Sequence, residues 1–460
     1  MERLQQQIRF CSLDSQDELQ VLLELSPPLF AKPNVYKQLR YVREYVRELG
    51  CQSLIIEAHY IDRDHMEDHS VFYSKNLHPY ANFCRRIHFF SCSVSEVKRH
   101  LKQLRAVNDS TEFHRQADEF SQQNYIGFSV IKPLAGCPVG RTVLRCFPET
   151  IPEADYVRRF DCACEYHAHV LGIPLRIRGL AFQQQDVGVS ACATTALWSA
   201  LQRTRALEET GAATPAQITI RASQYALPFG RSMPSEGLSI EQMCQAIHSF
   251  GYAPNLFRAD TYEVARALLY SSMLSGISPV LILESLDKSA AHAVAVVGMK
   301  LKQPRSTASA DLLEDRAATL SGLYLHDDRI GPYLRADLRK RYKKAYINIP
   351  LRDFPAGETW RLSHVLIPMH AKIRLSFGEL QRASLAVVTY VHALRESVLD
   401  QSPCKTSWEA WIAKSHSYVE SLIVGPRAAP AGVVEKLSLV FYTIQVEVVH
   451  FQGVAILKTA

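Results

Sequence analysis

The stretch on which our interpretation of the chain depends is QQQDVGVSACATTALW, residues 183–198, in which three glutamines and a short loop lead into Cys192. Neither proline nor glycine occurs from Ala193 to Thr210, where small and apolar residues are frequent. This pattern predicts a loop that enters a helix at or near Cys192. A thiol at the N-terminus of a helix feels the positive end of the helix dipole, which favours the thiolate over the thiol. The stretch therefore predicts a candidate nucleophile at Cys192.

A partner base and an orienting acid for this cysteine follow later in the chain. His292 begins a run of small and β-branched residues that predicts a strand. Asp327 ends the next predicted strand, at 323–326, and Asp328 follows it. If the two strands pair antiparallel as neighbours, His292 and Asp327 lie at the same end of the sheet. A thiolate nucleophile needs a nearby base, and that base needs a third group to fix its tautomer and orientation.

The order of these residues resembles the papain-like cysteine peptidases, and most closely the bacterial branch that includes the double-glycine leader peptidases. The resemblance covers residues 175–340, approximately. It implies Cys192 as the nucleophile, His292 as the general base and acid, and Asp327 as the orienting carboxylate. It further implies Gln185 as the donor to the oxyanion. We prefer Asp327 to Asp328 because it lies where the motif ends its strand, and because adjacent strand residues face opposite sides, so only one can reach the histidine.

The sequence departs from this family at three places. Ala193 follows the cysteine, where the family usually has glycine. The family's glutamine usually lies six residues before the cysteine, and Asp186 occupies that position here. The oxyanion donor is therefore assigned to Gln185, with Gln184 as the alternative. The segment between the histidine and the aspartate is also longer than usual, by about the length of a predicted loop or hairpin insertion at 300–321.

The composition is ordinary for a water-soluble globular protein. The chain has 460 residues, enough for two or three domains, of which 47% are hydrophobic and 21% charged. The net charge is +6 without a dense basic run, so nucleic acid binding is not signalled. No stretch reaches the roughly 18 apolar residues of a membrane span, and residues 1–10 lack the apolar core of a signal peptide. Eleven cysteines, an odd number, favour reduced thiols, and we expect a cytoplasmic protein.

The spacing of apolar residues predicts an α+β protein with three regions. The N-terminal α/β region, residues 1–170, has predicted helices at 35–49 and 94–107 and predicted strands at 51–56, 86–90, 125–131 and 142–146. The central papain-like domain, residues 171–345, has predicted helices at 192–209, 215–227, 239–250 and 261–275, then predicted strands at 279–283, 292–299, 323–326 and 330–334. The C-terminal α+β region, residues 346–460, has a predicted strand at 364–368 and predicted helices at 377–398 and 407–424. The central domain thus places the cysteine in a helical half and the histidine in an antiparallel β half.

Two further clusters contain residue types that bind metals. In the first, a strand would turn Cys162 and Cys164 to one side and His167 and His169 to the other, so the four would not converge on one ion. We expect buried thiols there. The second cluster contains His59, Asp62, Asp64, His65, Asp68 and His69. We interpret it as a solvated polar loop, because its spacing matches no known metal motif. The sequence predicts neither a metal nor a cofactor.

The predicted activity is thiol-dependent hydrolysis of a peptide or isopeptide bond in a peptide or protein substrate. In this prediction Gln185 and the backbone N–H of Cys192 bind the oxyanion. One alternative is a thiol acyltransferase or transglutaminase-type enzyme, which would use the same order of cysteine, histidine and aspartate. The other is a binding or scaffold protein with a catalytically inactive papain-like core. The flanking regions are expected to select the substrate or partner.

Overall fold

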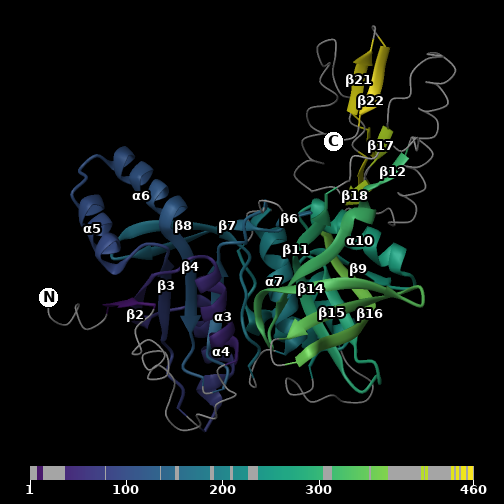
Figure 1. Cartoon of the computed structure of the whole chain (residues 1–460). Coiled ribbons are helices and arrows are strands. Elements are labelled where there is room, and N and C mark those ends of the chain that lie inside the picture. The colour runs from purple at the N-terminus through teal and green to yellow at the C-terminus, as the bar shows by residue number, and fades with distance from the viewer. Residues whose placement is uncertain are drawn as a thin grey trace.

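The computed structural model describes residues 8–13, 37–77, 79–134, 136–150, 155–186, 191–207, 211–225, 237–303, 313–351 and 354–370, and beyond these only short strands between 406 and 458. The described residues form an α+β protein in which an open antiparallel sheet and its helices lie beside a closed antiparallel barrel (Figure 1). Within these ranges, no helix combines the length and apolar character that crossing a membrane requires.

An open sheet of five strands is the centre of the N-terminal unit, the name used here for the described residues between 8 and 150. Its strands pair antiparallel in chain order: β1 (Ile8–Ser12), β2 (Ser53–Tyr60), β3 (Cys84–Phe90), β4 (Tyr125–Ile131) and β5 (Val139–Leu144). Its helices are α3 (Lys37–Glu48), α4 (Arg63–Val71), α5 (Val94–Arg105) and α6 (Ser110–Asn124), with the short 3-10 helix η3 (Tyr73–Lys75) after α4.

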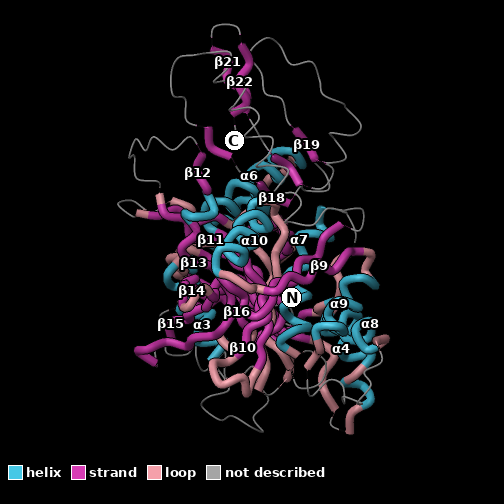
Figure 2. The backbone as a smooth tube through the Cα atoms, turned by 90° about the vertical axis from the view of Figure 1, so that its right-hand side faces the viewer, coloured by secondary structure: helices cyan, strands magenta, loops and turns pink. Residues whose placement is uncertain are grey.

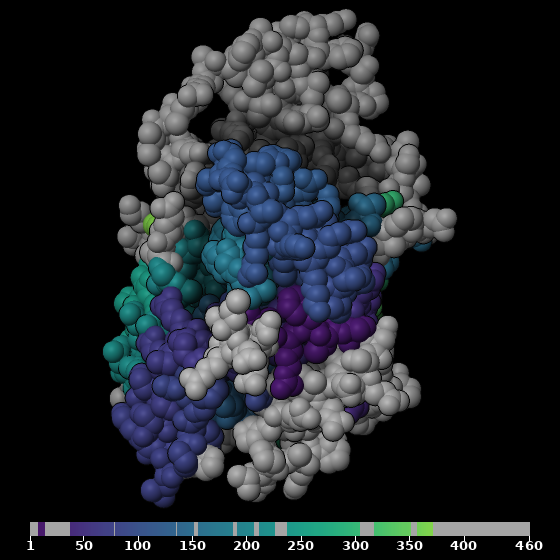
Figure 3. Space-filling view, turned by 90° about the vertical axis from the view of Figure 1, so that its left-hand side faces the viewer, coloured from purple at the N-terminus to yellow at the C-terminus, as the bar shows by residue number. Residues whose placement is uncertain are grey.

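Both faces of this sheet are covered, as the uninterrupted apolar run of β2 requires. Leu54 and Ile56 belong to the core that contains Leu39 of α3, whereas Ile55 belongs to the core that contains Leu101 of α5. Figure 3 shows the molecule from the side of the N-terminal unit, where the blue residues of α5 and α6 form much of the surface. The N-terminal unit is therefore a helix–sheet–helix sandwich.

A hairpin and four helices connect the N-terminal unit to the barrel. The strand β6 (Tyr156–Arg159) precedes a hairpin of β7 (Cys164–Val170) and β8 (Ile173–Gly179). The helices are α7 (Cys192–Leu207), α8 (Pro215–Ser223), α9 (Ile240–Ser249) and α10 (Tyr262–Leu274), and the strand β9 (Tyr252–Arg258) lies between the last two. A capping box formed by Ser239 and Gln242 starts α9 at the predicted position.

Six antiparallel strands close the barrel. Their order is β10 (Val280–Glu284), β11 (Ala291–Lys302), β13 (Leu320–Asp327), β14 (Gly331–Arg341), β15 (Lys344–Leu351) and β16 (Phe354–His370), and β16 pairs back onto β10. β9 extends the sheet from β16, and β6 pairs with β11. Figure 2 shows the barrel strands crossing in the middle of the molecule, with β9 between α10 and α9. The helix α7 packs on β11, so the helical half and the β half meet there.

The predicted helices and strands of the central domain follow one another in the predicted order, but the strand β9, between α9 and α10, is not predicted. The sequence pattern does not predict α6, because its buried residues include Ala117 and Ser121 and give little apolar periodicity. The predicted boundary at 170/171 lies in the turn between β7 and β8, and that at 345/346 lies inside β15, whose barrel continues to His370.

Two predicted helices lie in the C-terminal region. That at 377–398 lies outside the described residues. The predicted helix at 407–424 is wrong at its start, because the strands β17 (Thr406–Trp408) and β18 (Ala410–Ile412) occupy its first residues. The rest of this predicted helix lies outside the described residues. The remaining elements are β12 (Leu313–Asp315), η4 (Arg316–Thr319), β19 (Leu437–Leu439), β20 (Tyr442–Ile444), β21 (Glu447–Phe451) and β22 (Val454–Lys458).

Candidate active site

Cys192 is the first residue of α7 and is half-buried. Thr195 closes the first turn of the helix by donating its hydroxyl to the carbonyl of Cys192 at 2.9 Å. Trp198, one turn further, is fully buried and anchors the helix in the core. The side chains of Cys192 and His292 share a hydrogen bond. The structure therefore brings the predicted nucleophile and the predicted base together, although they are far apart in the sequence.

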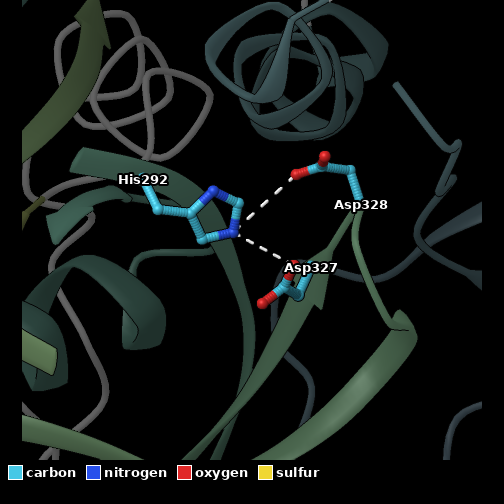
Figure 4. Close-up of side chains that lie close together, drawn as sticks. All are labelled: His292, Asp327 and Asp328. Atoms are coloured by element: carbon cyan, nitrogen blue, oxygen red, sulfur yellow. Dashed lines mark hydrogen bonds and ion pairs between the residues drawn. The ribbon is translucent and has the colours of Figure 1, made fainter. Parts of the chain in front are cut away.

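His292 is the second residue of β11 and is 5% exposed. Because β11 and β13 pair antiparallel, the start of the first and the end of the second lie at the same end of the barrel. The His292 Nε2 atom lies 3.0 Å from Oδ1 of Asp327 (Figure 4). With Nε2 directed at the carboxylate, Nδ1 is the ring nitrogen left for the thiol of Cys192.

Two aspartates, rather than one, face the imidazole. Asp327 is fully buried, and Asp328 follows it with its Oδ1 atom 3.8 Å from Nε2 of His292 (Figure 4). The expectation that only one aspartate reaches the histidine is wrong, because β13 ends at Asp327 and the alternation of a strand ends with it. Both carboxylate oxygens of Asp328 lack a hydrogen-bond partner among the described residues.

The charges of this cluster decide its protonation. Burial lowers the pKa of His292, but the charge and hydrogen bond of Asp327 outweigh it, and the hydrogen bond to Cys192 and the charge of Asp328 add to them, which raises the pKa to about 10. Burial raises the pKa of Asp327, but His292 and Arg329 hold it well below its usual range. For Asp328 burial dominates and raises the pKa to about 7. The imidazole is thus protonated at neutral pH, and Nε2–H donates to Asp327.

Arg329 is a member of the cluster that the sequence analysis missed. Its backbone N–H donates to Oδ1 of Asp327 at 3.0 Å, and its Nη2 donates to Oδ2 at 3.0 Å. Its guanidinium also pairs with both oxygens of Glu358, at 3.2 and 3.0 Å, and lies 5.1 Å from the ring centroid of Trp360. The arginine therefore fixes the carboxylate that orients His292. In the sequence Arg329 directly follows two aspartates, and this neighbouring positive charge is the signal that could have identified it.

The three glutamines before the cysteine lie in different environments. Gln185, the predicted oxyanion donor, is exposed. The carboxamide of Gln184, the alternative, is occupied: Oε1 accepts from the backbone N–H of Val139 at 3.3 Å, and Nε2 donates to the carbonyl of Gly136 at 3.2 Å. Gln183 is 3% exposed, and its Nε2 has no acceptor among the described residues. The assignment of Gln185 as the oxyanion donor stays a prediction. Gln183 is a further candidate for this role, because its buried amide donor has no acceptor among the described residues.

The histidine and the two aspartates also form the one group of described residues whose ligand atoms lie close enough together for a metal ion. One ligand atom each of His292, Asp327 and Asp328 lie within 4.8 Å of one another. The donor set fits a cation poorly, because the guanidinium of Arg329 donates to both oxygens of Asp327 and its Nε lies 3.2 Å from Nε2 of His292. A second cation there would be repelled by the first. This cluster is therefore not assigned as a metal site.

The first of the other two clusters behaves as predicted. Cys162 and Cys164 are buried, whereas His167 and His169 are exposed on β7, so the four do not converge.

The interpretation of residues 59–69 as a solvated loop is wrong, because α4 occupies this segment and buries Asp64, His65 and Asp68. The rings of His65 and His69 bond to the carbonyls of Ala81 and Tyr80, at 2.9 and 3.0 Å. The imidazole nitrogens that make these bonds are not available to a metal.

No protein-family model matches the chain. A search of curated proteins likewise returns no match.

Proposed function

We propose that this chain is a thiol-dependent hydrolase of peptide or isopeptide bonds, with a papain-like arrangement of Cys192, His292 and Asp327. One observation carries the proposal: the imidazole of His292 lies between a half-buried thiol at a helix N-terminus and a fully buried carboxylate. An imidazolium next to a thiol stabilises the thiolate, which is the nucleophilic form. A structural cysteine needs neither of these two partners.

The steps follow from the position of each group. The Cys192 sulfur attacks the carbonyl carbon, the S–C bond forms, and the carbonyl electron pair moves to the oxygen. His292 gives its Nδ1 proton to the leaving nitrogen as the C–N bond breaks, which leaves a thioester on the sulfur. The now neutral imidazole takes a proton from water, whose oxygen attacks the thioester. The C–S bond then breaks, the acid leaves and the thiolate is restored.

The oxyanion in this mechanism needs fixed hydrogen-bond donors. The proposed donors are the backbone N–H of Cys192, at the start of α7, and the carboxamide of Gln183. Gln183 is preferred to Gln185 because its Nε2 is a buried donor without an acceptor among the described residues, whereas Gln185 is exposed. The ten cysteines among the described residues are all free, which agrees with the reduced thiol that the mechanism requires and with the proposed cytoplasmic location.

The proposal is tested by alkylating the full chain with iodoacetamide at pH 5.5 and following each cysteine by peptide mass spectrometry. Cys92 and Cys244 are internal controls, because they are half-buried like Cys192 and burial raises the pKa of both thiols. We expect Cys192 to react at least about tenfold faster than either control, and Asp327→Asn to remove most of this difference. Equal rates at the three cysteines would contradict the proposal.

The same experiment extends to the chemical step with p-nitrophenyl acetate as the acyl donor. We expect an acetyl thioester at Cys192 that water hydrolyses, and Gln183→Ala to slow its formation by about 10²-fold while Gln185→Ala does not. The reverse result would assign the oxyanion to Gln185. Added methylamine separates the acyltransferase alternative, because a transferase would form N-methylacetamide in preference to acetate.

A further inference from the structure

The segment that leads to the nucleophile is bonded to the edge of the N-terminal sheet. The backbones of Thr142, in β5, and Phe182 exchange two hydrogen bonds, each of 2.8 Å. The backbone N–H of Gln184 donates to the carbonyl of Val139 at 2.9 Å. Residues 182–184 are therefore attached to the N-terminal sheet beyond β5.

A buried ion pair fixes the next part of this segment. Lys132, directly after β4, places its Nζ atom 3.1 Å from Oδ2 of Asp186, and the two side chains are 3% and 1% exposed. The Tyr73 side chain also bonds to Asp186. Asp186 lies at the position where the papain-like family usually has its glutamine. In this chain the position serves as an attachment point to the N-terminal unit.

The opposite side of the candidate active site is attached to the same unit through α3. The carboxamide of Gln38 donates to the carbonyl of Asp328 at 3.2 Å and to that of Arg329 at 3.0 Å. Tyr41 packs so closely on Gly331 that a Cβ atom there would overlap the tyrosine ring. Glu48, at the end of α3, pairs with Arg335 of β14. The turn that carries both aspartates thus rests on one helix of the N-terminal unit.

We propose that the N-terminal unit is the positioning frame of this site, with Gln38 and Lys132 as positioning residues for the aspartate turn and the cysteine segment. The inference rests on the proposed function and changes the expected role of the N-terminal region, from selecting substrate to setting the distance between thiol and imidazole. The cysteine begins α7, whereas the acids lie at the end of β13 and in the turn after it, so the spacing of the reacting groups depends on how these separate elements are held. Groups that react together must be held to within about half an ångström, so a shared support has a direct chemical effect.

The test measures the pH profile of Cys192 alkylation by iodoacetamide in full-length variants, together with the melting temperature. Gln38→Glu keeps the shape of the side chain but loses both donors, whereas Gln38→Lys keeps a donor. We expect Gln38→Glu to slow alkylation of Cys192 at pH 6 by roughly tenfold and to shift the acid limb of the profile to higher pH. Gln38→Lys should keep most of the wild-type rate. Arg40→Gln, at an exposed position of the same helix, is the matched control and should react as wild type.

A merely structural role would lower the melting temperature and leave the acid limb where it is, and this result would overturn the inference. Gln38→Ala is measured in parallel, so that an unfolded Gln38→Glu variant does not end the test. Lys132→Met combined with Asp186→Leu removes the buried pair without leaving a lone charge, and it should shift the same limb. If wild-type Cys192 shows no enhanced reactivity at acid pH, the proposed function fails. If wild type is reactive and these variants match it, only the positioning role fails.

Discussion

Two buried histidines of this protein have closely similar neighbours and opposite protonation. His88, in the N-terminal sheet, places its Nε2 atom 3.0 Å from a carboxylate oxygen of Glu57, and His292 places its Nε2 atom 3.0 Å from Asp327. An arginine contacts the carboxylate in both clusters. Yet the pKa of His88 is lowered, mainly by burial, whereas that of His292 is raised to about 10.

The balance of neighbouring charges and hydrogen bonds explains the difference in pKa. His88 is fully buried and faces one carboxylate, whose charge is partly neutralised by Arg86 at 2.5 Å. The remaining attraction does not offset the desolvation of an imidazolium. His292 faces Asp327 and, 3.8 Å away, Asp328, while the neighbouring arginine is shared with Glu358. Asp327 raises the pKa of His292 most, and the hydrogen bond of Cys192 and the charge of Asp328 add to it, so the ring stays protonated.

The two histidines also differ in the group that their other ring nitrogen contacts. Nδ1 of His88 bonds to the hydroxyl of Tyr125 at 2.8 Å, and burial raises the pKa of this fully buried phenol well above its usual value. The corresponding partner of His292 is the half-buried thiol of Cys192. A buried histidine–carboxylate pair is therefore not a site by itself. Such a pair becomes a candidate active site only where the other ring nitrogen contacts a reactive group that a substrate can reach.

The largest predicted effect is the difference in Cys192 reactivity between a variant that lacks His292 and one that lacks His88. His292→Gln should slow alkylation of Cys192 at pH 6 by at least about 10²-fold, because the thiolate loses its charged partner. His88→Gln should leave that rate within about twofold of wild type while lowering stability by roughly 1–3 kcal/mol, because its buried partners lose a hydrogen bond. Alkylation rates and urea unfolding of the two variants measure both quantities.

A loss of Cys192 reactivity in His88→Gln equal to that in His292→Gln would contradict the contrast between the clusters. Unfolding controls belong to the same experiment, since a partly unfolded variant would expose every cysteine and raise rather than lower the alkylation of Cys92 and Cys244.

How much of this was predictable from the sequence depends on the range of the interaction. The helix that begins at Cys192 and the strand after His292 follow from local patterns, and the antiparallel pairing of β11 with β13 follows from their order. The role of Arg329 and the convergence of Asp328 depend on where β13 ends, to the residue, which periodicity does not resolve. The contact of Gln38 with the aspartate turn joins segments 290 residues apart, and no local pattern marks it.

The second prediction uses pH to separate the two histidines by stability. The folded-state pKa of His292, about 10, lies above its unfolded value of about 6.5, so its stabilisation is complete below pH 6.5 and is lost as the pH rises through 10. The folded-state pKa of His88 lies below the unfolded value, so its stabilisation is complete above pH 6.5 and is lost as the pH falls through the folded value. The melting-temperature difference between wild type and His292→Gln should therefore shrink towards pH 10, and that for His88→Gln should shrink in acid. Two differences that change in the same direction would rule out this assignment of charge.

The smallest effect should come from Asp328→Asn, which leaves Asp327 as the one carboxylate beside His292. Asparagine keeps the volume and removes a charge that raises the pKa of His292, so that pKa should fall by about one unit. Titration of the ¹³C-labelled histidine rings measures it, with His88 as an internal reference that should not move. Burial raises the pKa of Asp328 to about 7, so wild type loses stability as the pH rises from about 4 through 7, and the variant should gain relative to it over that range. An unchanged pKa of His292 would mean that Asp327 alone sets the charge of the ring, and the difference between the two clusters would then have to come from Arg86 and Arg329.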